Sequence, residues 1–254
     1  MILAVDAGNS NIVLGCMNGL HTQHVMRVKT DRSMDTAGYC AALQAMLTSS
    51  GYPAALFEGA ILSSVVAAVT EPLRQALSLL LSGPVLVVGE TAKTQIPIRI
   101  DQPETTGTDL LAAAEGALVT YAPPLILVDM GTATTFSVLD ESGAFLGGAI
   151  APGVRLGAEA LIRQTGLPMF EIDAPQSPLS RNTADCLRSG VILGAAAMVD
   201  GMLERLETAL GTPAAAVATG GLASSVIPHC RRSIIVDDSL LLRGLAVMYY
   251  RETK

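Results

Sequence analysis

The order of apolar and polar residues along the chain predicts strands that alternate with helices. Short, continuous apolar runs that end at glycine, proline or charged residues predict buried strands at 60–64, 85–88, 214–219 and 234–236. Apolar residues at helical spacing predict helices at 36–49, 71–81, 106–119, 182–210 and 240–250. This alternation is typical of an α/β fold, in which helices pack on a mostly parallel sheet.

Two segments of the chain resemble each other. VDAGNSNIVLGCMNG starts at Val5, and VDMGTATTFSVLDESG starts at Val128. Each has Val-Asp-x-Gly at the end of an apolar run, then a β-rich stretch and an Asn-Gly or Ser-Gly dipeptide of the kind that closes a hairpin. Each copy therefore predicts a strand, a tight turn, a strand, a hairpin and a strand. We expect a duplicated molecule with lobes at 1–121 and 122–254, because two consecutive prolines break the chain just before the second core strand.

Composition excludes several classes of protein. Half of the 254 residues are hydrophobic and 15% are charged, which excludes a disordered chain. The formal net charge of −7 argues against nucleic acid or an anionic membrane as a partner, because phosphate binding requires clustered Lys and Arg. The chain has no run of about 18–20 uninterrupted apolar residues, so the sequence predicts no membrane span. The first residues lack the basic segment of a signal peptide, so we expect a cytoplasmic protein.

The repeated Asp-x-Gly turns are the first candidates for chemistry. Asp6 and Asp129 each end a buried strand, and the glycine two positions later lets the backbone approach a ligand closely. The small polar residues that follow offer N–H and side-chain donors to phosphate oxygens, whereas the carboxylate would act through Mg²⁺ or water. One such turn alone is an ordinary turn, but two in matched contexts indicate a phosphate-binding hairpin in each lobe.

Three glycine clusters follow, at 147–153, 189–194 and 219–223. The third lies where a predicted strand meets a helix, a common place for a nucleotide to rest against backbone amides. Each cluster alone could equally be a plain turn or a close helix contact. Neither a P-loop motif nor a G-x-G-x-x-G dinucleotide fingerprint occurs in the chain.

Taken together, the motifs identify the chain as similar to the type III pantothenate kinases, which belong to the acetate and sugar kinase, Hsp70 and actin superfamily. Six segments correspond in order to motifs of that family: 6–10 to Asp-x-Gly-Asn-Thr, 107–110 to Gly-x-Asp-Arg, 129–133 to Asp-x-Gly-Thr-Ala, 147–153 to Gly-Gly-x-Ile-x-Pro-Gly, 219–221 to Thr-Gly-Gly, and 237–245 to Asp-x-x-Leu-x-Leu-x-Gly-Leu. The resemblance spans essentially the whole chain.

The resemblance implies a fold and a reaction. The fold would be two duplicated ribonuclease H-like, actin-like ATPase domains, each with a mixed sheet flanked by helices. The reaction would be ATP-dependent phosphorylation of pantothenate to 4′-phosphopantothenate, the first step of coenzyme A biosynthesis. ATP with Mg²⁺ would lie between the lobes, and a monovalent cation, K⁺ or NH₄⁺, would be a further cofactor. A homodimer is also implied.

The resemblance assigns roles to individual residues. Asp109 would be the general base that accepts the proton of the pantothenate hydroxyl, Asp6 would orient Mg²⁺ through water, and Asp129 would bind the monovalent cation. Other ATP-binding residues would be Gly8, Asn9, Ser10, Asn11, Gly131, Thr132, Gly148, Gly220 and Gly221. Substrate-binding residues would be Gly107, Thr108, Asp109, Leu110 and Thr183, of which Thr183 would reach the substrate from the neighbouring subunit.

One position departs from the family pattern. Leu110 stands where the family motif has Arg, and a leucine cannot bind a carboxylate. Arg99, Arg155 or a residue of a partner chain could substitute, or the substrate could differ. Two alternatives therefore stay open: a nucleotide-binding regulatory homologue without turnover, and a kinase for another small hydroxylated acid or a sugar. Asp109 could also be a first-turn acid that only stabilises its helix, and Thr183 could be a helix N-cap.

Overall fold

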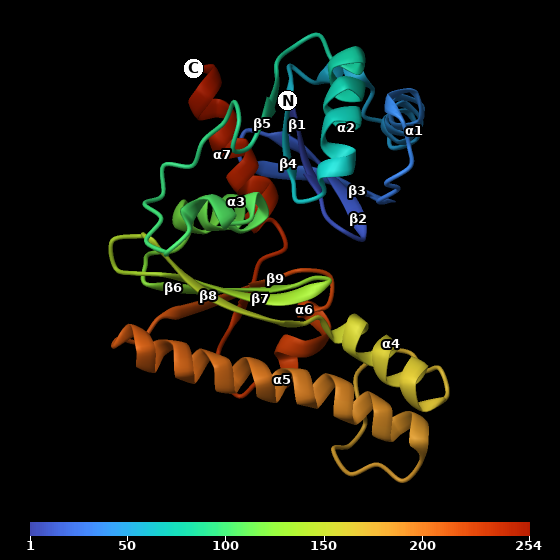
Figure 1. Ribbon diagram of the computed structural model, residues 1–254, viewed down its shortest axis with the longest axis vertical. Helices are drawn as coiled ribbons and strands as arrows, with labels where there is room; N and C mark the ends of the chain where they lie inside the picture. The colour runs from blue at the N-terminus through green and yellow to red at the C-terminus, as the bar shows by residue number, and fades with distance from the viewer. The chain divides into compact units, whose positions relative to one another are not determined.

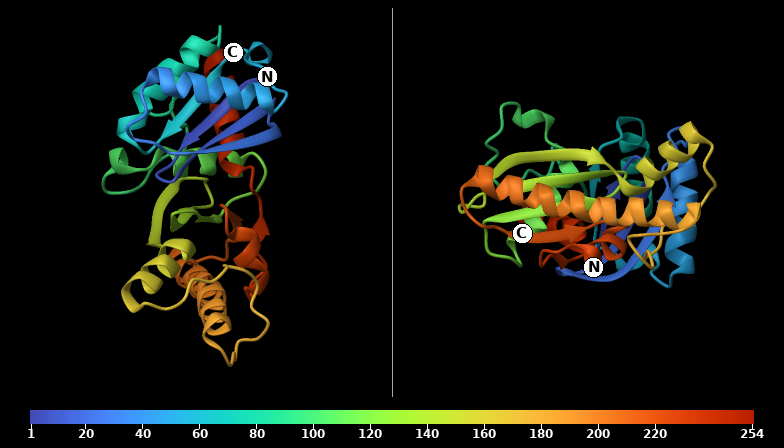
Figure 2. Two further views of the ribbon diagram at one scale, coloured as in Figure 1. Left: turned by 90° about the vertical axis from the view of Figure 1, so that its right-hand side faces the viewer. Right: turned by 90° about the horizontal axis from the view of Figure 1, so that it is seen from below.

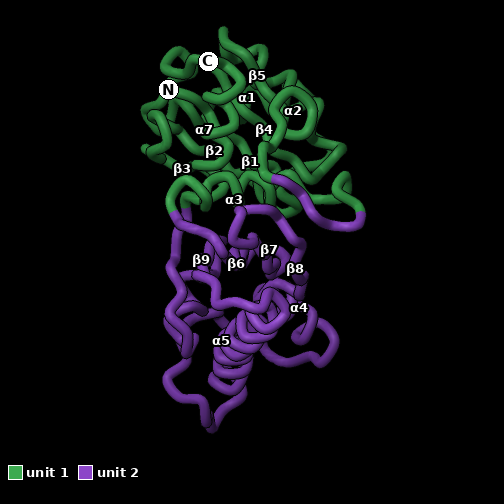
Figure 3. The backbone as a smooth tube through the Cα atoms, turned by 90° about the vertical axis from the view of Figure 1, so that its left-hand side faces the viewer, with its two compact units in different colours: residues 1–96, 102–120, 239–254 green, residues 97–101, 121–238 purple.

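The computed structural model describes residues 1–254 and divides into two compact units (Figure 3). Unit 1 comprises Met1–Ile96, Gln102–Thr120 and Ser239–Lys254, and unit 2 comprises Pro97–Asp101 and Tyr121–Asp238. The chain passes from one unit to the other at residues 120–121, close to the predicted boundary, but its last segment returns to unit 1. The division into domains 1–121 and 122–254 stays a prediction. The compact units differ from it because Pro97–Asp101 belongs to unit 2 and Ser239–Lys254 belongs to unit 1.

Unit 1 contains a five-stranded mixed sheet with the order β3-β2-β1-β4-β5 (Figure 1). Its strands are β1 (Ile2–Ala7), β2 (Asn11–Asn18), β3 (His21–Lys29), β4 (Ala60–Ser64) and β5 (Val85–Val87). β2 runs antiparallel to both of its neighbours, β1 and β3, whereas β4 and β5 run parallel to β1. The β2–β3 hairpin has the predicted turn at Gly19, whose φ of 58° suits glycine.

Helices cover both faces of this sheet. They are α1 (Thr36–Ser49), α2 (Ala67–Leu80), α3 (Thr108–Leu118) and α7 (Leu240–Thr253), with two 3₁₀ turns at Ala54–Leu56 and Pro103–Thr105. Side chains alternate along β1: Leu3 and Val5 pack with α1 and α2, while Ile2 and Ala4 pack with α3 and α7. α3 and α7 pack closely because Gly116 and Gly244 face the other helix, where a Cβ would meet the backbone oxygens of Leu240 and Ala112.

Unit 2 repeats this sheet with the order β10-β9-β6-β7-β8. Its strands are β6 (Leu125–Met130), β7 (Ala133–Leu139), β8 (Phe145–Pro152), β9 (Ala215–Thr219) and β10 (Ile235–Val236). β6 pairs antiparallel with β7 and parallel with β9, as β1 does with β2 and β4. The same topology in both units confirms the predicted duplication and the predicted fold class.

Unit 2 has helices α4 (Val154–Thr165), α5 (Thr183–Leu210) and α6 (Ala223–Val226), and a 3₁₀ turn at Ile227–His229. The right-hand view of Figure 2 shows α5 as one long helix. By length and composition α5 could cross a membrane, but core helices of water-soluble proteins pass the same test, so this is a weak indication. One side of α5, with Ile192, Ala196 and Val199, lies in the core of the unit.

Three helices differ most from the sequence-based prediction: α2, α4 and the four-residue α6, which was not predicted. α2 begins four residues earlier than predicted, at Ala67, and contains Pro72. Its first turn is closed ahead of the proline, since Val69 N–H donates to the Val66 carbonyl at 3.0 Å and Thr70 Oγ1 donates to the same oxygen at 3.1 Å. α4 was not predicted, since its N-cap is Gly153 without a side-chain hydrogen bond and only Val154 and Ala158 are buried. The glycine at 166, with a φ of 69°, was the available sign of its C-terminus.

Candidate active site

Asp6 lies near the carboxyl end of β1, the central strand of unit 1. Its neighbours in the sheet are Val13 on β2 and Ser63 on β4. Residues in register on adjacent strands point to the same side of a sheet, so Asp6 and Ser63 lie on the side of Ile2 and Ala4, which faces α3 and α7.

A pair of hydroxyl groups joins the start of α3 to this edge of the sheet. Ser63 Oγ and Thr108 Oγ1 lie 3.0 Å apart and share a hydrogen bond. Since Asp109 follows Thr108 directly, the structure brings the predicted base and the predicted magnesium ligand Asp6 to one edge of unit 1. Sequence reasoning missed Ser63, although a Ser-Ser pair at the end of an apolar strand was a usable signal.

Asp109 occupies the first turn of α3 in a half-buried position. Its Oδ1 accepts a hydrogen bond from the N–H of Leu110 at 2.9 Å. Burial raises the pKa of the Asp109 carboxyl above its ordinary value, and the backbone hydrogen bond only partly offsets this. A Cβ on Gly107 would overlap Asp109 Oδ1, so a glycine at 107 leaves room for the carboxylate. The position of Asp109 suits a general base. It also suits the alternative that the sequence left open, an acidic residue that stabilises the first turn of its helix.

The turn between β1 and β2 presents its polar residues outward. Gly8 N–H donates to the Asn11 carbonyl at 3.0 Å, which closes the turn. Asn9, Ser10 and Asn11 are exposed. Their side chains and the Asn9 amide can therefore reach a ligand, as the phosphate-binding prediction requires.

Asp129 occupies the corresponding position in unit 2. Its register neighbours are Thr135 on β7 and Thr219 on β9, and all three lie on the side of the sheet opposite α5. Gly220, with a φ of 97°, follows β9 directly, and a Cβ on it would lie 2.5 Å from Asp129 Oδ1. The glycine is therefore needed for close approach of the β9 end to Asp129.

The turn after Asp129 packs against the start of α4. Gly153 N–H donates to the Thr132 carbonyl at 3.1 Å, and a Cβ on Gly153 would overlap that oxygen. Four of the predicted residues, Gly131, Thr132, Gly220 and Gly221, thus gather with Asp129 at one edge of unit 2. Gly148 does not join them, because it lies within β8 opposite Ser137, where a Cβ would overlap the Phe136 carbonyl.

The donor groups around both aspartates suit oxygen-binding cations. No cluster of three or more His, Cys, Asp or Glu residues is present, so a cage built of several carboxylates is absent. Thr135 Oγ1 is buried without a hydrogen-bond partner and neighbours Asp129 in the sheet. One carboxylate with hydroxyl groups fits a cation that takes its remaining ligands from water or phosphate.

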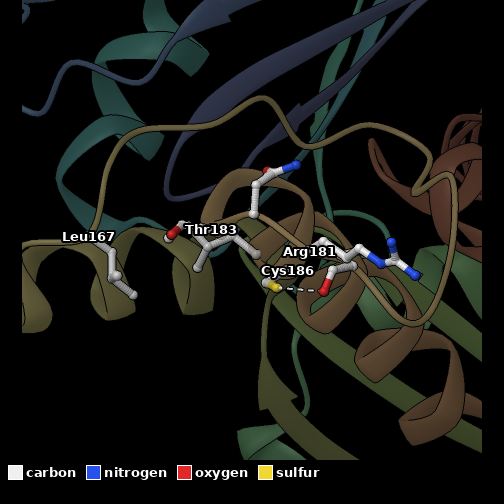
Figure 4. A pocket seen from close by; sticks show the side chains of 7 residues that line it. Leu167, Arg181, Thr183 and Cys186 are labelled. Carbon is white, nitrogen blue, oxygen red and sulfur yellow. Dashed lines mark hydrogen bonds between the residues drawn. The ribbon is translucent and has the colours of Figure 1, made fainter.

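Thr183 lies elsewhere in unit 2, at the first residue of α5. The N-cap is Asn182, whose Oδ1 accepts from Asp185 N–H at 2.9 Å, so Thr183 is not the cap. Thr183 lines an open cavity of about 540 Å³ (Figure 4). Its walls are Leu167, Ser180, Arg181, Asn182, Thr183, Cys186 and Leu187.

Comparison with known proteins identifies the family. A family model described as type III pantothenate kinase matches residues 2–205. The chain belongs to the type III pantothenate kinase family. Among its relatives, the type III pantothenate kinase of Moorella thermoacetica is 37% identical over all of both chains. That of Brevibacillus brevis is 38% identical over 99% of both chains. The family predicted from the sequence, and with it a phosphotransferase, is thus confirmed.

Solved structures support the fold. A conserved putative Baf family transcriptional activator from Campylobacter jejuni matches with a TM-score of 0.62 at 17% identity, over 98% of each chain. Component A of the Acidaminococcus fermentans (R)-2-hydroxyglutaryl-CoA dehydratase matches with a TM-score of 0.59 at 15% identity, over 100% of this chain and 99% of its own. At these identities the likeness concerns the fold alone.

Arg99 and Arg155 are the two arginines that the sequence offers as substitutes for the family Arg at position 110. Arg99 forms an ion pair with Asp140 at 2.7 Å, so its guanidinium is already engaged. Arg155 is exposed at the start of α4. Both belong to unit 2, whereas Leu110 belongs to unit 1.

Proposed function

We propose that this protein transfers the γ-phosphoryl group of ATP to the 4′-hydroxyl of pantothenate, the first step of coenzyme A biosynthesis, in the cytoplasm. The observation that carries this proposal is the full-length match to type III pantothenate kinases at 34–38% identity. The convergence of Asp6, Ser63 and the start of α3 in unit 1 supports it independently.

Asp109 is the general base in this proposal. Phosphoryl transfer depends mainly on positioning and on neutralising charge, and a base adds roughly 10²–10⁴-fold. The raised pKa makes the Asp109 carboxylate a stronger base than an exposed aspartate. Its place in the first turn of α3 fixes the carboxylate, and the neighbouring Gly107, Thr108 and Leu110 surround the acceptor alcohol.

Each of the two Asp-x-Gly turns offers donors to nucleotide phosphates. Asn9, Ser10 and Asn11 donate after Gly8, and Thr132 donates after Gly131. The adenosine lies near Gly220 and Gly221. Gly148, within β8, is the predicted ATP-binding residue with the least structural support. Asp6 would hold Mg²⁺ through water, and Asp129 with Thr135 would hold K⁺ or NH₄⁺. Bound Mg²⁺ neutralises phosphate charge.

Measurement of ATP consumption with and without pantothenate tests the function. Turnover that requires pantothenate supports the kinase. ATP binding without turnover on any acceptor supports the regulatory alternative, and turnover on another hydroxylated acid or a sugar supports a changed substrate. Product analysis for 4′-phosphopantothenate separates the first outcome from slow ATP hydrolysis.

Replacement of Leu110 tests how the chain recognises the carboxylate of pantothenate. Leu110→Arg is expected to lower the KM for pantothenate several-fold, because a guanidinium can pair with a carboxylate and a leucine cannot. The KM for ATP should not change. Leu110→Met serves as the control, because it keeps an apolar side chain of similar size. An unchanged pantothenate KM in Leu110→Arg would show that position 110 does not face this substrate.

A homodimer is part of the proposal, and unit 2 offers the surface for it. Eight of the twelve exposed large hydrophobic residues belong to unit 2. They include Ile150 (78% exposed), Leu161 on α4, Met169 and Leu179 (80% exposed). Between α4 and α5 lies a mainly apolar groove of about 190 Å³. Thr183, at the start of α5, would then reach the substrate of the neighbouring subunit.

A charge on α4 tests this interface. Leu161→Glu is expected to convert the dimer to a monomer in size-exclusion chromatography with light scattering, because an unpaired charge in an apolar interface is costly. Leu79→Glu is the matched control, since Leu79 is an exposed helical leucine of unit 1. A dimer that persists in Leu161→Glu would place the interface elsewhere.

A further inference from the structure

The segment after β3 holds the β1–β2 turn in one orientation. Thr30 Oγ1 donates to the Gly8 carbonyl at 2.6 Å, and Thr30 N–H donates to the Ser10 carbonyl at 3.1 Å. In a trans peptide the carbonyl of one residue points away from the N–H of the next. The Asn9 N–H therefore points away from Thr30, and it makes no hydrogen bond within the protein.

Arg32, two residues later, reaches the same turn. Its Nη2 donates to Asn9 Oδ1 at 2.9 Å, and the residue is exposed. The two nearest carboxylates in the sequence are engaged elsewhere: Asp31 accepts from Ser33, and Asp35 caps α1 through Gly38 N–H. Arg32 makes no ion pair, so its positive charge is uncompensated beside the turn.

This contact also fixes the side-chain amide of Asn9. A guanidinium only donates hydrogen bonds, so the amide oxygen must face Arg32 and the amide NH₂ faces away. The turn thus presents the Asn9 N–H, the Asn9 NH₂ and the remaining donors of Arg32. An arrangement of donors with a fixed positive charge suits a phosphate group.

We propose that Arg32 binds a phosphate group of the nucleoside triphosphate and, through Asn9, positions the phosphate-binding turn. The proposal rests on the proposed function only for the identity of the anion. It adds a cation to a turn that otherwise offers neutral donors, and the role of Asp109 is unaffected.

Titration calorimetry in the absence of pantothenate tests this contact directly. Arg32→Ala is expected to weaken the binding of ATP with Mg²⁺ by roughly 10- to 100-fold, the loss typical of a charged hydrogen bond. Adenosine has no phosphate, so its affinity should stay within twofold of wild type. Arg32→Lys should recover part of the ATP affinity, since it keeps the charge but loses the planar geometry.

Arg27→Ala is the matched control, because Arg27 is an exposed arginine of β3 in the same unit. It should bind ATP like wild type. The loss in Arg32→Ala should shrink at high salt, because salt screens exposed charges. In steady-state kinetics, Arg32→Ala should raise the KM for ATP and leave the KM for pantothenate unchanged.

Two results would overturn the proposal. ATP affinity equal to wild type in Arg32→Ala would show that Arg32 does not contact phosphate. An equal loss of adenosine affinity would show that Arg32 acts only on the shape of the site. The binding test needs no turnover, so an inactive wild-type protein would defeat the pantothenate kinase assignment without deciding the role of Arg32.

Discussion

Asp109→Asn is expected to reduce kcat by roughly 10²–10⁴-fold, since asparagine cannot accept the proton of the acceptor alcohol. The affinity for ATP should remain within about twofold, because the substitution keeps the size of the side chain and removes only its charge. The melting temperature should be unchanged or higher. A coupled ATPase assay measures kcat, and differential scanning fluorimetry measures the melting temperature. Wild-type turnover in Asp109→Asn would show that another group is the base.

The sign of the stability effect follows from the raised pKa of Asp109. A carboxyl whose pKa is higher in the folded protein than in the unfolded chain binds its proton more tightly when folded. The contribution of this carboxyl to the stability of the fold is therefore favourable at pH values below its pKa in the unfolded chain. It is lost as the pH rises through its pKa in the folded protein. At neutral pH the ionised, desolvated carboxylate therefore destabilises the fold, and asparagine relieves this cost. In the wild type, kcat should fall on acidification as Asp109 becomes protonated.

Glu115→Ala is expected to lower the free energy of unfolding by about 3 kcal/mol, the lower end of the range for breaking a buried ion pair. Glu115 is 8% exposed, and its carboxylate accepts from Arg251 of α7 at 3.1 Å and from Thr94 and Gln95 at 2.9 Å. Loss of Glu115 leaves the Arg251 charge without its partner in a half-buried position. Denaturant unfolding followed by circular dichroism measures the change.

Two further variants check this interpretation. Glu71→Ala removes the exposed ion pair with Arg74 and should have little measurable effect. The double variant Glu115→Leu with Arg251→Leu should be more stable than Glu115→Ala, because it leaves no unpaired charge. A free energy of unfolding equal to that of the wild type in Glu115→Ala would show that the ion pair between Glu115 and Arg251 does not stabilise the packing of α7.

The sequence predicts the duplication because the repeated Val-Asp-x-Gly segments carry both a strand pattern and a turn signal. The strand register explains why the prediction of a duplication is correct: Asp6 and Asp129 occupy matching positions in sheets of the same strand order. Periodicity gives the helix at 240–250 but not its unit, because helical spacing does not reveal the packing partner. The contact between Gly116 and Gly244 depends on both helices together.

The candidate site was predictable where a motif marks it. Asp6 and Asp129 begin recognisable Asp-x-Gly turns and Asp109 stands in a Gly-x-Asp motif, whereas Ser63, Thr30 and Arg32 have no motif of their own. Their positions depend on strand pairing and on a loop that folds back on the β1–β2 turn. Hydrogen bonds between segments distant in the chain, such as that between Ser63 and Thr108, leave no periodic trace in the sequence.

The packing of α7 on α3 affects the order of folding during synthesis. β1 to β5 leave the ribosome well before residues 240–253, which complete their apolar cluster with Leu245, Met248 and Tyr249. Until then, the nascent chain exposes Ile2, Ala4 and Ile61 on one side of the sheet. The first unit therefore cannot finish folding before the second has been translated, and chaperones that bind apolar segments have their opportunity in this interval.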